Sequence, residues 1–201
     1  MVKPVADVIE IDELYKIGNT IEDGKIKALF YLCYLSGARV GEAIKLTRRD
    51  IKIVNEAMVI SLYTEKHKGN PTREIPIVII ENKNHISYNT IEREMANVIL
   101  DYIKDIPPEA NLFPHSRQSV FNMFVRYFFT NVRFKHEGNI VDTQLKRINP
   151  HYLRHCRITH LRKEYGYDAL DLVRFAGWTD TRPATVYLHL GHKELSKKML
   201  V

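Results

Sequence analysis

Apolar residues recur at helical spacing in two long segments of the chain. In residues 23–35 they stand three or four positions apart, at Ile26, Leu29, Phe30, Cys33 and Tyr34, which places them on one face of a helix. Residues 116–135 show a similar spacing. We expect a helix there, ended by 137–139, with an apolar face of Val120, Phe121, Phe124, Val125, Phe128 and Phe129.

A strand-like pattern follows a break at Gly37. Residues 51–53 and 58–63 have the composition of strands, and residues 68–71 (Lys-Gly-Asn-Pro) form a turn signal. Residues 73–79 then return as a partner strand. This predicts a small antiparallel sheet inserted between helices.

The remaining segments predict further helices, at 12–17, 39–47, 91–106, 150–165, 169–176 and 181–188. Asn149 suits a helix cap and Pro150 the first helical position, so His151 should lie in the first turn of its helix. Gly166 is placed to end that helix. The fold class is therefore mainly α with a small antiparallel β-sheet, an α+β fold.

Length and composition limit the class of protein. A chain of 201 residues with 45% hydrophobic residues can bury a core and fits a single domain. It contains no apolar run of about 18 residues and no signal-peptide pattern at its start. The two cysteines, Cys33 and Cys156, are isolated in helical segments, which indicates reduced core residues of a cytoplasmic protein.

Positive charge is concentrated in the second half of the chain. The net charge is +6, and residues 1–100 carry 14 basic and 14 acidic residues, so the excess lies entirely in residues 101–201. Residues 110–163 hold 10 basic residues against Glu137 and Asp142. A basic surface of this kind is typical of a protein that binds a polyanion, although a solvated cationic face is the simpler alternative.

Five residues of types that suit phosphoryl transfer occur in a fixed order. Arg39 and Arg154 offer guanidinium groups for a phosphodiester, and His151 lies three residues before Arg154 on the same helix face. Trp178 and then Tyr187 follow, with a ring N–H and a phenol. Each residue alone is more simply a surface or core residue. Together they indicate a site that holds a phosphodiester while a tyrosine attacks it.

The ordered set resembles the catalytic domain of the tyrosine recombinase (phage integrase) family. That family's pattern is a Gly-x-Arg-x-x-Glu helix start, a lysine on a β-hairpin, a His-x-x-Arg-His helix, a Gly-His or Gly-Trp turn and a tyrosine about nine residues later. The residues of this chain that match the pattern are Arg39 with Glu42, a hairpin lysine, His151 with Arg154 and His155, Gly177 with Trp178, and Tyr187. The runs at 175–180 and 187–190 are most similar to archaeal members.

The resemblance implies a role for each of these residues. Arg39, Arg154 and His151 would bind the scissile phosphate, and Trp178 would donate its ring N–H to it. Tyr187 would attack, forming a 3′-phosphotyrosine and freeing a 5′-hydroxyl. No metal or other cofactor is implied. Double-stranded DNA is the expected partner, with self-association as a tetramer on DNA and a monomer when isolated. We expect DNA contacts from Lys68, Arg73, Arg117, Arg147 and His155.

The hairpin offers two lysines for the general acid that protonates the departing 5′ oxygen. Counting forward from the strand at 59–63 favours Lys66, whereas counting back from the strand that starts at Arg73 favours Lys68. We prefer Lys66, because loop length varies more than the end of a strand. A second Gly-His pair, Gly191-His192, lies after Tyr187 with no tyrosine following, and we interpret it as part of the tail.

Other interpretations of the chain stay open. Family members usually have a separate N-terminal DNA-binding domain, whereas we expect residues 1–201 to form a single catalytic domain, either a fragment or a minimal protein. Such a domain should bind DNA weakly and with steep salt dependence. A type IB-like DNA topoisomerase uses the same chemistry. A non-catalytic DNA-binding protein of the same fold is a further alternative. A ribonuclease or phosphatase using His151 would leave Tyr187 unexplained.

Overall fold

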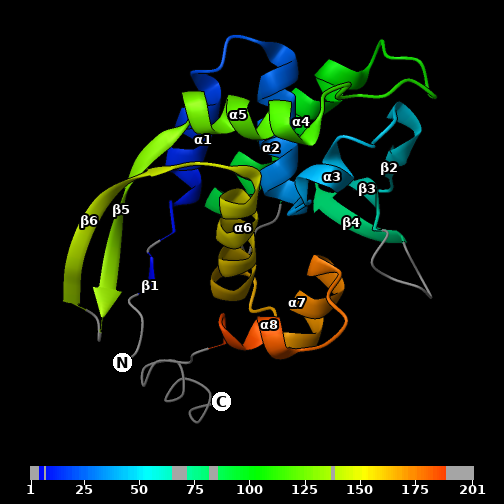
Figure 1. Cartoon of the computed structure of the whole chain (residues 1–201). Helices are drawn as coiled ribbons and strands as arrows, with labels where there is room; N and C mark the ends of the chain where they lie inside the picture. Colours follow the sequence, from blue (N-terminus) through cyan, green and yellow to red (C-terminus); the bar gives the residue numbers. More distant parts are fainter. Residues whose placement is uncertain (1–4, 7, 65–71, 82–85, 137–138, 189–201) are drawn as a thin grey trace.

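A computed structural model describes residues 5–6, 8–64, 72–81, 86–136 and 139–188 of the chain. Helices dominate it, with two three-stranded antiparallel sheets at opposite sides (Figure 1). The elements in order are β1 (Val5–Ala6), α1 (Ile11–Asn19), α2 (Gly24–Ser36), α3 (Val40–Ala43), the 3-10 turn η1 (Arg48–Asp50), β2 (Ile51–Val54), β3 (Ala57–Tyr63), β4 (Thr72–Val78), α4 (Ile86–Ile103), α5 (Arg117–Tyr127), β5 (Phe129–His136), β6 (Asn139–Arg147), α6 (Pro150–Glu164), α7 (Ala169–Ala176) and α8 (Arg182–Thr185). No helix in this described part is long and apolar enough to cross a membrane.

The central helix of the core is α2. Its N-terminus is capped by Asp23, whose carboxylate accepts hydrogen bonds from the backbone N–H groups of Lys25 and Ile26. Every residue from Ala28 to Ser36 is buried, and the helix packs against both α4 and α6. It ends at Gly37, which adopts a left-handed conformation with φ 56°. The break predicted at Gly37 therefore lies where α2 ends, three residues before α3 begins.

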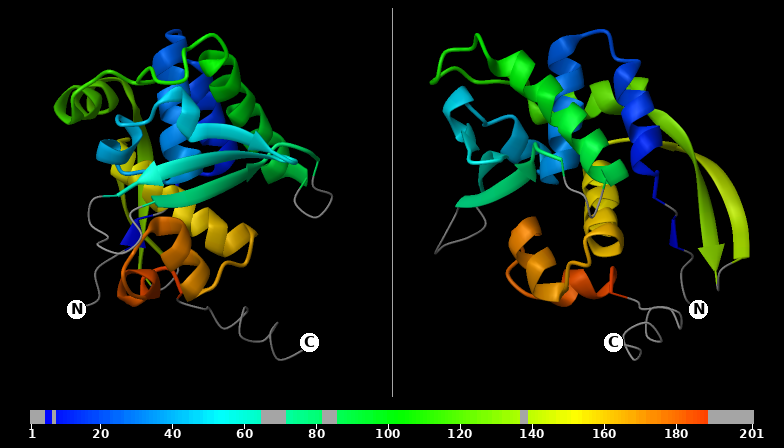
Figure 2. Two further views of the ribbon diagram at one scale, coloured as in Figure 1. Left: turned by 90° about the vertical axis from the view of Figure 1, so that its right-hand side faces the viewer. Right: turned by 180° about the vertical axis from the view of Figure 1, so that it is seen from behind.

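The predicted hairpin sheet is confirmed, in the order β2-β3-β4. Met58, Ile60 and Leu62 alternate with more exposed residues on β3, as a sheet with one buried face requires. The β3–β4 register pairs Leu62 with Arg73. Strand β4 contacts α7, and the two elements lie next to each other in Figure 2. The β3–β4 hairpin of this sheet therefore packs against the helices that carry the candidate site.

The helix predicted over 116–135 is wrong in its second half. Helix α5 ends at Tyr127, and β5 and β6 form a long hairpin, which β1 joins as a third strand. The segment 129–134 contains β-branched and aromatic residues in near alternation, which suits a strand. The helical spacing of phenylalanines was misleading because Phe128 is buried in extended backbone, edge-on to the ring of Phe30 at 5.0 Å between centroids.

The other predicted helices occur, but two are much shorter than expected. The segment predicted as helix 39–47 contains only α3, because Ile44 ends it and Thr47 pairs with Asn111 in an isolated bridge. The segment 181–188 contains only α8. Arg39 is the N-cap of the short α3, and Tyr187 follows the short α8 by two residues.

Candidate active site

Arg154 joins the two segments that carry the other candidate residues. It lies in the middle of α6 and is only 4% exposed. Its Nη1 donates to the carbonyl oxygen of Gly37 and its Nη2 to that of Ala176, both at 2.6 Å. One guanidinium therefore holds the end of α2 and the end of α7 against α6. A guanidinium has five N–H donors, so donors remain for a phosphate.

Tyr187 and Trp178 lie next to this arginine. The two rings are stacked, with centroids 6.1 Å apart, and the guanidinium carbon of Arg154 lies 5.7 Å from the centre of the Trp178 ring. The hydroxyl of Tyr187 is 3.1 Å from Nδ1 of His155 on α6. Burial raises the pKa of Tyr187, and the positive charge of Arg154 acts in the opposite direction. A phenol that is harder to ionise needs a partner to receive its proton.

Arg39 is held by Glu42 at the start of α3. The Glu42 carboxylate accepts from the backbone N–H of Arg39 at 2.8 Å and from its Nη1 at 2.9 Å. The same carboxylate accepts two hydrogen bonds from Arg73, whose Nε donates to the carbonyl oxygen of Phe175 at 3.0 Å. Glu42 therefore fixes Arg39 from one side and the hairpin residue Arg73 from the other.

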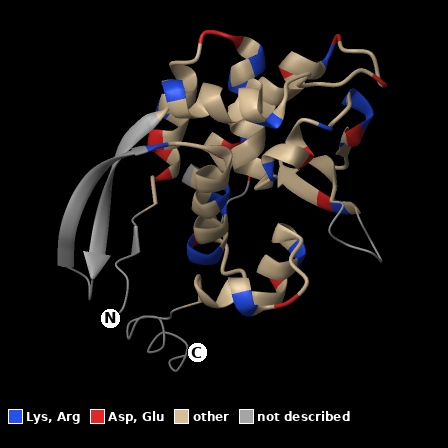
Figure 3. Ribbon diagram, viewed as in Figure 1, with Lys and Arg blue, Asp and Glu red and all other residues tan. Residues whose placement is uncertain are grey.

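The site carries more positive than negative charge. Burial, followed by the nearby charges of Arg39 and Arg73, lowers the pKa of Arg154 to about 10, against the smaller and opposite effect of Glu42. Three guanidinium groups with one carboxylate leave a net charge of +2 among these four residues. Further basic residues lie on α6, α7 and α8 (Figure 3). An arriving anion would relieve this repulsion, so the electrostatics favour phosphate binding.

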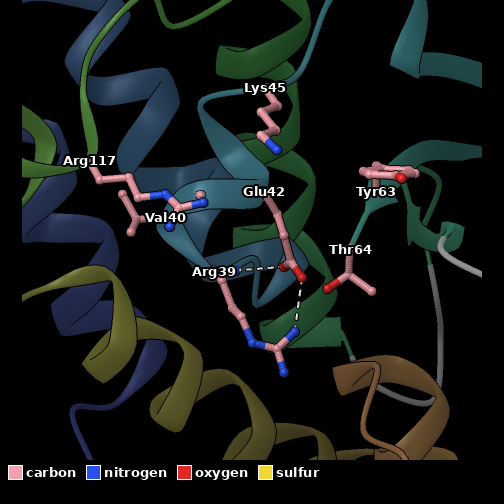
Figure 4. Close-up of a pocket in the computed structure, with 8 residues that line it drawn as sticks. Arg39, Val40, Glu42, Lys45, Tyr63, Thr64 and Arg117 are labelled. Atoms are coloured by element: carbon pink, nitrogen blue, oxygen red, sulfur yellow. Dashed lines mark hydrogen bonds and ion pairs between the residues drawn. The ribbon is translucent and has the colours of Figure 1, made fainter. Parts of the chain in front are cut away.

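A cavity of about 310 Å³ opens beside Arg39. Arg117 reaches it from one side of α3, and Tyr63 and Thr64 from the other (Figure 4). A Cβ on Gly41 would lie only 2.7 Å from the Arg117 guanidinium, so the bare glycine lets Arg117 pack closely on α3. Arg117, which was predicted to contact DNA, therefore lies beside Arg39, which was predicted to bind the scissile phosphate. Lys45 and Tyr63 also line this cavity, and neither was predicted to belong to the site.

The structure places the remaining predicted residues less centrally. His151 is exposed in the first turn of α6, as its helix position predicts, and its role in phosphate binding stays a prediction. Arg147 is exposed at the end of β6, where it donates to the carbonyl oxygen of Val125 at 3.0 Å. Lys66, Lys68 and the Gly191-His192 pair lie outside the described residues.

Arg73 has a position that the sequence reasoning missed. Its side chain is 10% exposed, and its nitrogens donate to Glu42 and Phe175, which favours a structural role over the predicted DNA contact. A Cβ on Gly177 would lie 3.1 Å from this side chain. A signal was present, because Arg73, Ile75 and Ile77 alternate on the inward face of β4. Strand alternation alone could have placed Arg73 inside the protein.

Glu42→Gln is expected to lower the stability of the protein at neutral pH by about 3 kcal/mol. Burial raises the pKa of Glu42, but its bonds to Arg73 and Arg39 outweigh this and lower the value to about 2, from an ordinary 4.5. Since the folded-state pKa is depressed, the carboxylate stabilises the fold fully above about pH 5, and this stabilisation is lost as the pH falls toward 2.

Urea denaturation between about pH 2 and pH 7 measures this effect. The wild-type protein should lose stability through the acid range, whereas Glu42→Gln should start lower at pH 7 and change less. Glu56→Gln, at an exposed turn residue, serves as the control and should follow the wild type. Parallel curves for the wild type and Glu42→Gln would contradict the assignment.

The matches to known proteins agree with this fold and site. Residues 6–194 match the model of the phage integrase family. This match covers most of the chain, and the chain belongs to that family. Its members include the tyrosine recombinase class that the ordered residues resembled.

Individual relatives are distant in sequence. The tyrosine recombinase XerD of Vibrio cholerae is 27% identical over 173 residues, which cover 85% of this chain and 51% of XerD. Among solved structures, the XerA recombinase superposes with a TM-score of 0.64 at 16% identity, covering 100% of this chain and 65% of that one. The Tn1549 transposon integrase, solved in complex with transposon right end DNA, superposes with a TM-score of 0.61 at 18% identity, over 96% and 65% of the two chains. The chain spans about half to two thirds of the length of the curated relatives it matches.

Proposed function

We propose that the chain is the catalytic domain of a site-specific DNA recombinase or integrase, which cleaves and rejoins strands through a 3′-phosphotyrosine at Tyr187. The observation that carries this proposal is the contact series from Tyr187 to Trp178 to Arg154. In this series the phenol ring packs on the indole and the indole packs on the guanidinium, which supports attack by Tyr187 on a phosphodiester bound at Arg154. Family membership and the fold shared with recombinases support the same chemistry.

The reaction follows from what each side chain can donate or accept. Arg39, Arg154 and His151 bind the nonbridging oxygens of the scissile phosphate, where negative charge grows in the transition state. Trp178 donates its ring N–H to the same group. The Tyr187 oxygen forms a bond to phosphorus while the bond from phosphorus to the 5′ oxygen breaks, and a lysine protonates that oxygen. The 5′-hydroxyl of a partner strand then attacks the phosphotyrosine and releases Tyr187.

Double-stranded DNA is the proposed partner, contacted by Arg117 and Arg147 as well as Lys68. The position of Arg117 beside Arg39 supports this, because a strand whose phosphate lies at Arg39 passes the cavity. We also propose that residues 1–201 act as one catalytic domain in the cytoplasm and that several copies, four by the resemblance, assemble on DNA. The runs at 175–180 and 187–190 support an archaeal affinity.

The proposal is tested with nicked DNA that carries the cognate site, followed by a denaturing gel. The wild-type protein should form a covalent protein–DNA adduct, and Tyr187→Phe should form none, because a phenyl ring has no nucleophile. Tyr167→Phe, another half-buried tyrosine, serves as the matched control and should react normally. An equal adduct with Tyr187→Phe, or no adduct with the wild type on any site-bearing substrate, would refute the proposal.

The same assay separates the two hairpin lysines. Replacing the general acid by alanine should slow cleavage by about 10²-fold or more, and the other lysine variant should cleave almost normally. We keep Lys66 as the preferred residue. Normal cleavage by Lys66→Ala together with slow cleavage by Lys68→Ala would reverse that preference.

A further inference from the structure

The hydroxyl of Tyr187 has a hydrogen-bond partner that the ordered motif does not explain. Nδ1 of His155 lies 3.1 Å from it, and the two rings are 5.4 Å apart between centroids. This distance is within the reach of a general base. His155 was predicted only to contact DNA, and no residue was predicted to accept the proton of the tyrosine.

The arrangement of α6 explains why His155 faces the tyrosine. His155 follows Arg154 directly, so the two side chains leave the helix in different directions. Arg154 turns inward to the carbonyl groups of Gly37 and Ala176, whereas His155 is half-buried and turns toward Tyr187. His151 lies four residues earlier, one turn away on the same face, and is exposed. The two histidines on this helix face therefore differ in solvent exposure.

We propose that His155, acting through Nδ1, is the general base that takes the proton of Tyr187 as the tyrosine attacks. The inference rests on the proposed function, since it concerns the same reaction. In the step, the Tyr187 O–H proton moves to Nδ1 while the oxygen forms its bond to phosphorus. The bond to the 5′ oxygen breaks, and that oxygen receives its proton from the hairpin lysine. His155 gains the proton that Tyr187 loses, the lysine gives one proton to the 5′ oxygen, and the tyrosine oxygen exchanges its hydrogen for phosphorus, so the step is balanced.

Two neighbouring groups act on the pKa of Tyr187 in opposite directions. Arg154 is the cation that acts on Tyr187, and Cys156 on α6 acts on it with the opposite sign. The Trp178 ring is stacked on that of Tyr187, and Tyr152 contributes a ring 6.3 Å from that of His155. A bound phosphate is an anion beside the pair, and it would favour the imidazolium that forms when His155 takes the proton.

The tautomer of His155 can be measured on the protein alone. A neutral imidazole that accepts through Nδ1 carries its hydrogen on Nε2. Nitrogen NMR of histidine-labelled protein above neutral pH should show this tautomer, with the signal assigned by its loss in His155→Asn. A neutral His155 with its proton on Nδ1 would overturn the proposal whatever the activity of the protein.

The rate of adduct formation tests the catalytic role. His155→Asn keeps an oxygen near the place of Nδ1 that can accept the tyrosine hydrogen bond, but the amide is not basic. We expect this variant to form adduct about 10²-fold more slowly or worse. His115→Asn, in the loop between α4 and α5, is the matched control and should react at the wild-type rate. A normal rate for His155→Asn would overturn the proposal, because a hydrogen bond alone would then suffice.

A sulfur-containing substrate separates the base from the acid. When sulfur replaces the bridging 5′ oxygen, the leaving thiol has a pKa of about 8.5 and departs without a proton. This substrate should restore cleavage to the hairpin-lysine variant and leave His155→Asn slow. Rescue of His155→Asn would show that it acts on the leaving group and would overturn the assignment. A wild-type protein without any adduct would instead refute the proposed function, and the tautomer measurement would still decide on His155.

Discussion

Arg154→Lys is expected to slow adduct formation by about 10³-fold and to lower the free energy of unfolding by about 2 kcal/mol. The loss in rate has two sources. A lysine has no fork with which to donate to a phosphate, and a single ammonium group cannot span the carbonyl oxygens of Gly37 and Ala176 as Arg154 does. The segment after α7, which contains Trp178 and Tyr187, would then lose its fixed position.

Single-turnover kinetics with the nicked substrate, combined with urea denaturation, measure both effects. Arg162→Lys, on the same helix and half-buried, is the control and should change neither value appreciably. A rate within threefold of the wild type would mean that positive charge alone is needed at this position, and the proposed bridging role of the guanidinium would be wrong.

Glu92→Gln is expected to destabilise the protein by about 3–5 kcal/mol without any direct effect on the chemistry. Glu92 on α4 and Arg157 on α6 form a buried ion pair, and both are almost fully shielded from solvent. The Arg157 guanidinium also lies over the ring of Tyr34, 5.5 Å from its centre. Burial lowers the pKa of Arg157, but the charge of Glu92 more than compensates and raises it. Removing the carboxylate leaves a buried charge without compensation.

A double variant tests this explanation. Glu92→Leu combined with Arg157→Met removes both charges and should recover most of the stability lost by either change alone, because burying apolar groups of similar size costs less than burying one ion. Asp101→Asn, exposed on the same α4, is the control for the loss of a carboxylate. If the double variant is as unstable as the sum of the single variants, the pair does not act as a unit.

Local sequence signals were sufficient where an element is defined by its own residues. Asp23 and Gly37 mark the two ends of α2, and Asn149 and Pro150 mark the start of α6. The turn signal lies between β3 and β4 in the sequence. They failed over 128–136, where β5 forms by pairing with β6 and β1. That pairing depends on residues far apart in the chain, so helical spacing of aromatic residues could not reveal it.

The candidate site shows the same limit. The motif order was enough to place Arg154, Trp178 and Tyr187 together, and the structure brings their side chains into contact. The partnership of Arg73 with Glu42 and Phe175 depends on how the hairpin packs on α7. The contact between His155 and Tyr187 depends on the position of α8 relative to α6. Neither follows from residue spacing alone.

Glu42 gives the protein an internal counter-ion. Without it, Arg39, Arg73 and Arg154 would repel one another whenever no nucleic acid is bound, and the segments that carry them would tend to separate. The shared carboxylate keeps Arg39 and Arg73 in place in the empty state. DNA would then meet cationic groups that are already arranged, and little binding energy would be spent on ordering them.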